Sequence, residues 1–437
     1  MDSSQQLLEP YFDRLDRGST LRWDGRVSQV IGSLIESDGP FCSIGESCQI
    51  LCGDERTYMG QVIGFKGSKV LSMALEDPQG VHFGDRIVTC GIRPSIRVGT
   101  ELLGRVIDAV GNPLDGRGEY RAERRVWIDG TAPQHLDRKP IREIQGCGIR
   151  ALDGFVTSGR GQRIGLFGGS GVGKSTLLGM MARGTSADMT VLALVGERGR
   201  EVGEFLEVLG EEGRKRSVVI VSTSDQSPLL RMQAALSATA VAEYFAKMGK
   251  HVLLVADSLT RFAMAQREIG LSAGEPPTSK GYTPSVLNTL AKLVERVGNF
   301  KTGSITAFYT VLMEGDDQQD PVVDTVRSLL DGHVVLDRSL AMKNHYPPIS
   351  VLDSLSRLMS SVASKEHIRK AKHLRQLLAA YARSEDLIRI GAYQKGTDPT
   401  LDRAVELLPK LNEFLQQRPD EIVPIGDALK TLMEIPD

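Results

Sequence analysis

The chain has 437 residues, 41% of them hydrophobic and 25% charged, which excludes a disordered chain and allows about three domains with substantial buried cores. Its 53 basic and 55 acidic residues give a formal net charge of −2, and this balance argues against a dedicated nucleic-acid-binding protein. No apolar stretch approaches the ~20 residues that span a bilayer, so a membrane-spanning helix is not expected.

The first element predicted in chain order is a helix within residues 1–20. Its apolar residues fall at helical spacing on one face, and Gly18 follows as a stop; these residues are Leu7, Leu8, Tyr11, Phe12 and Leu15. Pro10 lies inside the pattern, where it starts, kinks or breaks a helix. The apolar face either docks on the chain's own domain or is offered to a partner, and the pattern leaves both open. The start MDSSQQLLEPYF has no signal-peptide pattern, so a soluble intracellular protein is expected.

Residues 21–93 are predicted to form a small β-barrel or sandwich. Short apolar runs broken by Gly, Asp and Ser are typical of such folds; examples are GRVSQVIGSLIES, SCQILCG, YMGQVIGFKGSKVLSMAL and DRIVTC. Pro94 marks the expected end. The chain's five cysteines contain no CxxC pair and lack the spacing of a zinc site, so we expect buried free thiols.

Residues 94–345 are predicted to form a parallel sheet covered by helices. Apolar strand-like runs alternate with helical patterns, as in RIGLF, TVLALVGE, SVVIVSTS, HVLLVAD, SITAFYTVL and HVVLD. After about Pro348 the strand signals stop, and residues 346–437 are predicted to be helical, with a helix over 363–393. The basic residues of that helix favour a solvated face over a binding patch.

The clearest motif is GLFGGSGVGKSTLL, from Gly165 to Leu178, which contains GxxxxGK[ST] between a predicted strand and a predicted helix. That setting is the one a P-loop requires. Backbone N–H groups can surround phosphate oxygens only where no side chain blocks them, and the helix N-terminus adds a positive end. The predicted nucleotide-binding residues are Gly168, Gly169, Ser170, Gly171, Val172, Gly173, Lys174, Ser175 and Thr176.

Two carboxylates are expected beside this loop. The strand HVLLVAD ends in Asp257, which with the Ser175 hydroxyl can anchor Mg²⁺, while Lys174 supplies charge to the terminal phosphates. The strand TVLALVGE ends in Glu197. Parallel strands bring their C-terminal ends to one edge, so Glu197 can lie near the P-loop and polarise an attacking water. On position alone, a surface glutamate in a charged turn is the alternative.

Together these segments resemble the catalytic subunits of rotary ATP synthases and the related ATPases of protein export, over nearly the whole chain. The resemblance implies an α/β fold with a P-loop (RecA-like) parallel-sheet core, an N-terminal β-barrel and a C-terminal helical domain. It also implies ATP and Mg²⁺ as ligands. The domains are accordingly placed at residues 1–20, 21–93, 94–345 and 346–437.

The resemblance also assigns roles to single residues. GERGREVGEF resembles the segment with the catalytic glutamate, which falls on Glu197, with Arg198 and Glu201 at neighbouring polar positions. Glu201 is counted with Ser175 and Asp257 among the metal ligands. DSLTRFAMAQREIG resembles the magnesium-aspartate segment and places Arg261 near the terminal phosphate.

HYPPISVLDSLSRLM resembles the segment with an adenine-stacking tyrosine and an arginine finger, which fall on Tyr346 and Arg357. In the family such an arginine completes a neighbouring subunit's site, and a finger supplied in this way is worth about 10³–10⁵ in rate. The resemblance therefore implies a homohexameric ring in which every site has the same neighbour.

Within that group, EPPTSKGYTPSVLNTLAKLVERVGN and AFYTVLMEGDDQQDPVVD are most similar to type III protein-export ATPases. IGAYQKGTDPTLD favours the flagellar branch, and the injectisome branch stays open. The implied partners are a stator-like regulator on the N-terminal helix, a central stalk-like protein, export-gate membrane proteins and chaperone–substrate complexes. The implied location is the cytoplasm, at the inner-membrane export apparatus.

Three other functions are weaker. A rotary ATP-synthase subunit shares the site, but EGDDQQDP favours export. A nucleic-acid translocase needs clustered aromatic and basic residues on its barrel, whereas Phe41, Tyr58, Phe65 and Phe83 are scattered, and no nucleic-acid partner is expected. A non-catalytic nucleotide-binding subunit of this family lacks the carboxylate that Glu197 provides.

Overall fold

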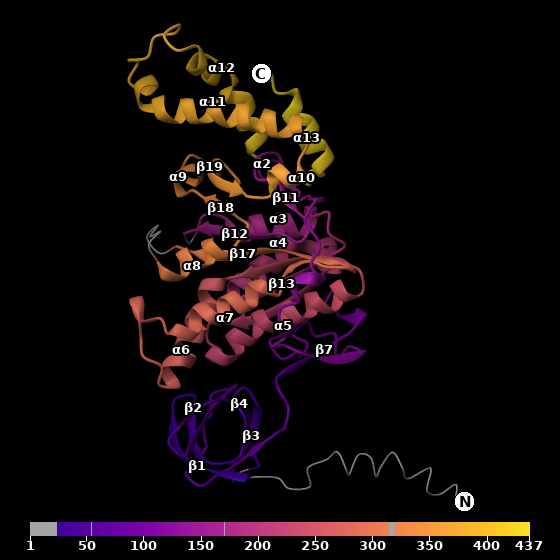
Figure 1. Ribbon diagram of the computed structural model, residues 1–437, viewed down its shortest axis with the longest axis vertical. Helices are drawn as coiled ribbons and strands as arrows, with labels where there is room; N and C mark the ends of the chain where they lie inside the picture. Colours follow the sequence, from indigo (N-terminus) through magenta and orange to yellow (C-terminus); the bar gives the residue numbers. More distant parts are fainter. Residues whose placement is uncertain (1–23, 54, 170, 314–319) are drawn as a thin grey trace, which may run out of the picture. The chain divides into compact units, whose positions relative to one another are not determined.

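The computed structural model describes residues 24–53, 55–169, 171–313 and 320–437 (Figure 1). The described chain divides into two compact units. One holds the residues up to Pro94 together with Ser272–Gly274, and the other holds the rest. The helix predicted within residues 1–20 lies outside the described residues and stays a prediction.

The first unit is a closed β-barrel with strands in the order β1-β2-β5-β4-β3-β6, each pair antiparallel. Val27, Ile35, Ile50 and Ile87 are almost fully buried inside it. The alternation of apolar and polar residues thus leads to a barrel, the fold that the sequence and the family resemblance predict. The strands are β1 (Asp24–Ile31), β2 (Leu34–Asp38), β3 (Ser47–Leu51), β4 (Thr57–Lys66), β5 (Lys69–Ala74) and β6 (Arg86–Thr89).

The second unit is built on a sheet with the strand order β19-β18-β12-β17-β15-β13-β14-β8. All neighbours from β18 to β8 are parallel, as predicted, because the strands are apolar on both faces and helices connect them. Its strands are β8 (Val106–Asp108), β12 (Arg163–Gly168), β13 (Met189–Glu197), β14 (Ser217–Thr223), β15 (His251–Asp257), β17 (Ser304–Leu312), β18 (Gly332–Leu336) and β19 (Ile349–Ser356).

Short elements surround this sheet. β16 (Gly298–Asn299) pairs with β17, and two small sheets join β7 (Ser95–Val98) to β9 (Arg124–Trp127) and β10 (Ile144–Gln145) to β11 (Ser158–Gly159). The short helices are η1 (Thr100–Leu102), η2 (His135–Asp137), α2 (Arg150–Phe155), η3 (Ser279–Gly281), α9 (Arg338–Met342) and α10 (Met359–Val362).

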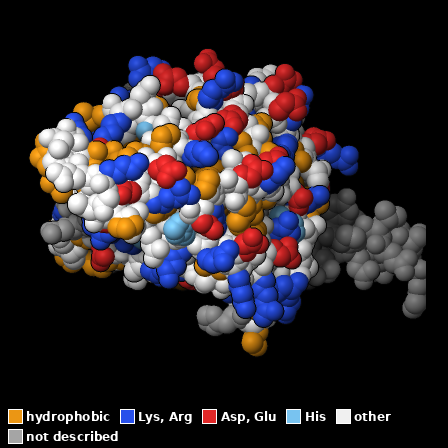
Figure 2. All heavy atoms as spheres, turned by 90° about the horizontal axis from the view of Figure 1, so that it is seen from above, with side chains coloured by type: hydrophobic (Ala, Val, Ile, Leu, Met, Phe, Trp, Pro, Cys, Tyr) orange, Lys and Arg blue, Asp and Glu red, His pale blue; other side chains and the backbone are white. Residues whose placement is uncertain are grey.

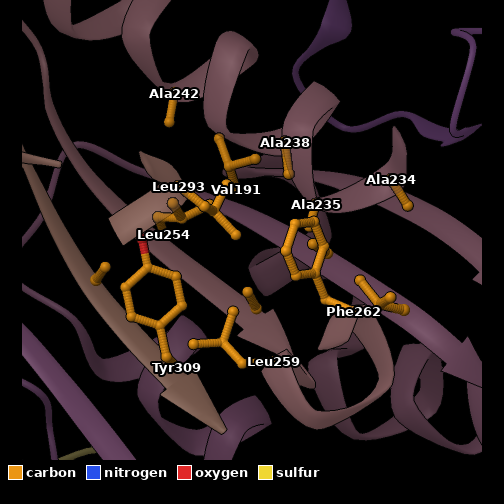
Figure 3. Packing of buried hydrophobic residues seen from close by; sticks show 14 of the residues in the cluster. Val191, Ala234, Ala235, Ala238, Ala242, Leu254, Leu259, Phe262, Leu293 and Tyr309 are labelled. Carbon is orange, nitrogen blue, oxygen red and sulfur yellow. The ribbon is translucent and has the colours of Figure 1, made fainter. Parts of the chain in front are cut away.

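Helices cover both faces of the sheet. α3 (Lys174–Gly184) and α4 (Gly199–Lys215) contribute to the core on one face, and α5 (Pro228–Lys247), α6 (Leu259–Ser272), α7 (Pro284–Glu295) and α8 (Pro321–Leu329) to the core on the other. Figure 3 shows alanines of α5, among them Ala235 and Ala238, beside Val191 and Phe262. Small side chains let α5 pack close to the strands that carry the site.

One sequence expectation is wrong: strands do not stop after about Pro348. The segment ISVLDSLS forms β19, which pairs antiparallel with β18, so the core sheet continues past residue 345. β19 is an edge strand with alternating polar and apolar residues, and it lacks the continuous apolar run that marks the inner strands.

The C-terminal helices α11 (Lys365–Arg389), α12 (Pro399–Leu415) and α13 (Ile425–Glu434) share a core with α2 and α3. On α11, Lys365, Arg369 and Lys372 are exposed, as predicted for a solvated face. The neighbouring Lys370 instead pairs with Asp437 at 2.7 Å. Figure 2 shows Lys and Arg side chains interspersed with Asp and Glu over much of the face at the top of Figure 1. Some basic residues of α11 are therefore exposed to solvent, while Lys370 is buried and holds the C-terminal residue by an ion pair.

Two further observations concern cysteines and membranes. Cys48, Cys52 and Cys147 are buried as expected, but Cys42 and Cys90 are only partly buried. In the part of the chain that the structure describes, no helix is both long and apolar enough to cross a bilayer.

Candidate nucleotide site

The P-loop motif forms the predicted strand–loop–helix unit. β12 ends at Gly168, α3 begins at Lys174, and the loop between them needs glycine because φ is +78° at Gly171 and +85° at Gly173. A Cβ built on Gly171 meets no atom within 4 Å, so this part of the backbone faces open space. The side chain of Val172 is buried in the core, which leaves only its backbone for a ligand. Ser170 lies outside the described residues.

Lys174 and Asp257 come together across the sheet. Lys174 Nζ lies 2.6 Å from Asp257 Oδ1, and the two side chains are only 13% and 3% exposed. This contact brings the start of α3 to the end of β15, although 83 positions separate the two residues in the chain. Arg261, on the first turn of α6, donates its backbone N–H to Ser258 Oγ at 3.2 Å.

Glu197 is turned toward the same edge by an irregular strand end. The pairing of β13 with β14 shifts between Val195 and Glu197, and Gly196 between them has φ +68°. A Cβ on Gly196 would lie 3.3 Å from Arg261 Cδ. Glycine therefore suits this position because of both the positive φ and the close approach of Arg261. Glu197 itself is only 8% exposed.

Two glutamates share a hydrogen bond here. Burial raises the pKa of Glu197 to about 7, and the hydrogen bond with Glu201 and the charge of Asp257 act in the same direction. The same hydrogen bond lowers the pKa of Glu201. Of the two glutamates, Glu197 is therefore the one that binds a proton first as the pH falls, and in that form it can donate to the Glu201 carboxylate.

Lys174 and both glutamates line one cavity of about 370 Å³, whereas Asp257 is not on its wall and meets Lys174 behind it. Its walls carry most of the predicted residues and three that sequence reasoning missed, Arg200, Glu204 and Leu312. Arg200 and Glu204 lie one turn apart on α4, where their charges look like those of any exposed helix, so the sequence offers no signal for them. The predicted members of the lining are Gly169, Gly171, Gly173, Lys174, Ser175, Thr176, Glu197, Arg198, Glu201 and Arg261.

Tyr346 stands beside the start of α3. Its ring carbon Cε1 lies 3.6 Å from a Cβ built on Gly173, and the residue is 42% exposed. Its carbonyl accepts a hydrogen bond from the N–H of Gln417, which follows α12, at 2.9 Å. The half-exposed ring can stack on an aromatic base. Sequence reasoning missed the segment after α12 because it carries no motif.

Arg357 is not brought to this cavity. β19 runs antiparallel to β18, with Ile349 opposite Leu336 and Ser356 opposite Gly332. Leu336 is level with Gly168, where the P-loop begins. Arg357 directly follows Ser356, which lies opposite Gly332 at the other end of β18, about 13 Å along that strand from Leu336. The side chain is exposed at the edge of the sheet.

The donor set fits a magnesium ion bound together with a phosphate. Mg²⁺ prefers hard oxygen ligands and is held by one or two carboxylates plus water and phosphate oxygens. Ser175 and Asp257 supply a hydroxyl and a carboxylate, and Glu201 is a second carboxylate on the cavity wall. Among the described residues, no cluster of His, Cys, Asp and Glu side chains could hold a metal without such a ligand.

Family models match three parts of the chain. The beta-barrel domain of the ATP synthase alpha/beta family matches residues 27–91, and the nucleotide-binding domain of that family matches residues 148–356. The C-terminal domain of the type III secretion ATPase EscN matches residues 363–434.

Similar proteins cover nearly the full chain. It is 49% identical to the flagellum-specific ATP synthase of Bacillus subtilis and 45% identical to the type 3 secretion system ATPase of Xanthomonas euvesicatoria, each over 94% of both chains. The assembled ATPase EscN of the enteropathogenic E. coli type III secretion system superposes with a TM-score of 0.89 at 42% identity, over 94% of this chain and 99% of EscN. EscN in complex with its central stalk EscO superposes with a TM-score of 0.87 at 42% identity, over 94% of this chain and 99% of that one.

Proposed function

Because this chain belongs to the ATP synthase alpha/beta family, we propose that it hydrolyses ATP in a homohexameric ring that assists the loading and unfolding of proteins for flagellar type III export. The observation that carries the proposal is the meeting of Lys174, Asp257 and Glu197 at one edge of the sheet, around a loop shaped for phosphate. A P-loop alone binds nucleotide, whereas the added carboxylate supports hydrolysis.

Different residues of the chain bind the phosphates, the adenine, the attacking water and the metal ion. The loop N–H groups from Gly168 to Thr176 and the Lys174 ammonium bind the phosphates, and Arg261 and Arg198 add positive charge at the cavity. Tyr346 stacks on the adenine. Glu197 orients the attacking water and takes up its proton. Ser175, Asp257 and Glu201 would hold Mg²⁺, which when bound neutralises charge on the β- and γ-phosphates.

Lys174→Ala is expected to lower ATP turnover by about 10²–10³-fold, because it removes a charged partner of the phosphates from a nearly buried position. The measurement is steady-state ATPase activity of the purified chain, with thermal unfolding as a check that the fold survives loss of the Asp257 partner. Lys365→Ala, at an exposed position on α11, is the matched control and should keep its activity. Undiminished turnover in Lys174→Ala would refute the assignment of the P-loop.

The activity should depend on pH through Glu197. Its active form is the carboxylate, and its pKa is raised to about 7, so kcat/KM is expected to fall about tenfold per pH unit below pH 7 and to level off above it. Terminal phosphates also titrate near pH 6. The Glu201→Gln variant separates titration of Glu197 from titration of the phosphates. Its amide N–H should donate to the Glu197 carboxylate and so move the midpoint of the pH profile to lower pH. A midpoint that stays in place would exclude Glu197 as the titrating group.

The position of Arg357 supports the ring. At the far end of β19 it cannot serve its own chain's P-loop edge, but it is exposed where another subunit can meet it. EscN, 42% identical to this chain, was solved as an assembled ATPase. A closed ring would give each cavity one finger from its neighbour.

The proposed partners follow from the same branch of the family. EscN was also solved with its central stalk EscO, and we propose an equivalent stalk for this ring. We further propose a stator-like regulator on the helix predicted within residues 1–20, together with export-gate proteins and chaperone–substrate complexes, and a cytoplasmic location at the inner-membrane export apparatus.

The injectisome is the alternative branch, since relatives of both kinds match at similar identity. Capture of partners from cells by the full chain, compared with a chain lacking residues 1–18, separates the two. Flagellar stator and gate proteins support the first branch, and their injectisome counterparts support the second. A regulator captured equally by both chains would place its site outside residues 1–18.

A further inference from the structure

A buried hydroxyl lies directly behind the carboxylate of Asp257. Thr310 is fully buried near the end of β17, and its Oγ1 donates a hydrogen bond to Asp257 Oδ1 at 2.6 Å. The same carboxylate oxygen lies 2.6 Å from Lys174 Nζ. The next carbonyl oxygen, that of Ala256, is 3.3 Å from the hydroxyl, so the single proton of Thr310 goes to Asp257.

The topology fixes this hydroxyl between the two halves of the site. β17 lies between β12, which leads into the P-loop, and β15, which ends in Asp257. Thr310 is level with Leu166 of β12, and Tyr309 before it is level with Ala256 of β15. A β-branched side chain within a central strand has little rotational freedom, so the hydroxyl is held rigidly.

The two partners of Asp257 differ in what happens when nucleotide binds. Lys174 is on a flexible stem, and phosphates draw its ammonium away from the carboxylate. Asp257 is only 3% exposed, and a buried carboxylate left without a partner is costly and free to rotate. The hydrogen bond from Thr310 does not depend on Lys174, because it comes from the sheet itself.

We propose that Thr310 is a positioning residue that holds the Asp257 carboxylate in the orientation for Mg²⁺ once Lys174 has moved to the phosphates. This inference rests on the proposed function, because it presumes that Asp257 takes part in magnesium binding. Groups that orient a metal ligand in this way typically contribute 10–100-fold to metal affinity or activity.

Four full-length proteins test the inference: wild type, Thr310→Val, Thr310→Ser and Thr190→Val. Valine keeps the shape of threonine and removes the donor, while serine keeps the donor. Thr190 is the matched control, since it is equally buried on β13 and its hydroxyl has no hydrogen-bond partner among the residues that the structure describes. Calorimetry measures the affinity for a slowly hydrolysed ATP analogue in EDTA and at increasing Mg²⁺, and turnover gives the Mg²⁺ concentration for half-maximal activity.

In Thr310→Val, affinity in EDTA should stay within about twofold of wild type, while the gain in affinity that Mg²⁺ brings should fall about 10–100-fold. Half-maximal turnover should need correspondingly more Mg²⁺. Thr310→Ser and Thr190→Val should behave like wild type. Thr310→Ala replaces Thr310→Val if the valine variant unfolds.

Three other results separate failure of this inference from failure of the proposed function. If wild type responds to Mg²⁺ and Thr310→Val responds equally, Thr310 has no positioning role. Equal losses in EDTA and in Mg²⁺ also overturn the inference, because they indicate that the hydroxyl supports the fold alone. A wild-type protein whose binding and turnover ignore Mg²⁺ overturns the proposed function itself.

Discussion

Replacing Arg357 with alanine is expected to lower ATP turnover by about 10³–10⁵-fold, the contribution of an arginine finger in phosphoryl transfer. Each subunit should keep its fold and bind ATP with little change. The reason is geometric: the residue follows the end of β19 remote from the P-loop, so it contributes nothing to its own chain's cavity. Turnover and nucleotide affinity must be measured separately, under conditions that favour assembly.

Two variants sharpen this test. Arg357→Lys keeps the charge but loses the planar fork that contacts several phosphate oxygens, so it should recover only a small part of the activity. Arg369→Ala removes an exposed arginine of α11 and should leave turnover near wild type. Wild-type turnover in Arg357→Ala would exclude this residue as the finger.

Glu197→Gln is expected to bind ATP like wild type and to hydrolyse it about 10²–10⁴-fold more slowly. The amide copies the protonated form of Glu197, because it can still donate a hydrogen bond to the Glu201 carboxylate. The fold, and the charge that the cavity has below the pKa of Glu197, are therefore preserved, and the ability to accept a proton from water is lost. The remaining slow turnover should no longer change near pH 7.

Single-turnover measurements check this variant. ATP affinity, from binding to excess protein, should stay within a few-fold of wild type, and the rate of cleavage should fall. Glu204 lies on α4, one turn beyond Glu201 and on the same cavity wall, and Glu204→Gln is the matched control that should cleave ATP at a rate close to wild type. Rapid cleavage by Glu197→Gln would assign the base to another group.

Much of the site could be predicted because its residues are tied to local patterns. The P-loop sits in a strand–loop–helix motif, and Asp257 and Glu197 end apolar parallel strands, whose C-terminal ends share one edge. The sequence contains both the motif and the strand ends. Thr310 is likewise a polar residue near the end of the apolar strand SITAFYTVL, but only the strand order in the structure shows that it is a partner of Asp257.

Other features depend on tertiary contacts that the sequence does not encode locally. β19 lacks an apolar run because it has one neighbour, and its direction decides that Tyr346 and Arg357 lie toward opposite ends of β18. The contact of Gln417 with Tyr346 joins a segment after α12 to the site without any motif. The raised pKa of Glu197 results from burial, and the irregular strand end at Gly196 is seen only in the structure.

The central claim is that each ATP site is completed by a neighbouring subunit, and mixing two inactive variants tests it most directly. Arg357→Ala subunits retain the Lys174 site, and Lys174→Ala subunits retain the finger. Nucleotide and Mg²⁺ favour the ring by mass action. In a ring assembled from equal amounts of the two variants, about one quarter of the interfaces should pair an intact Lys174 site with an intact Arg357 finger. ATPase activity is therefore expected to rise from near zero toward about one quarter of wild type. A mixture that stays inactive, while wild-type subunits mixed with either variant under the same conditions remain active, would contradict the claim.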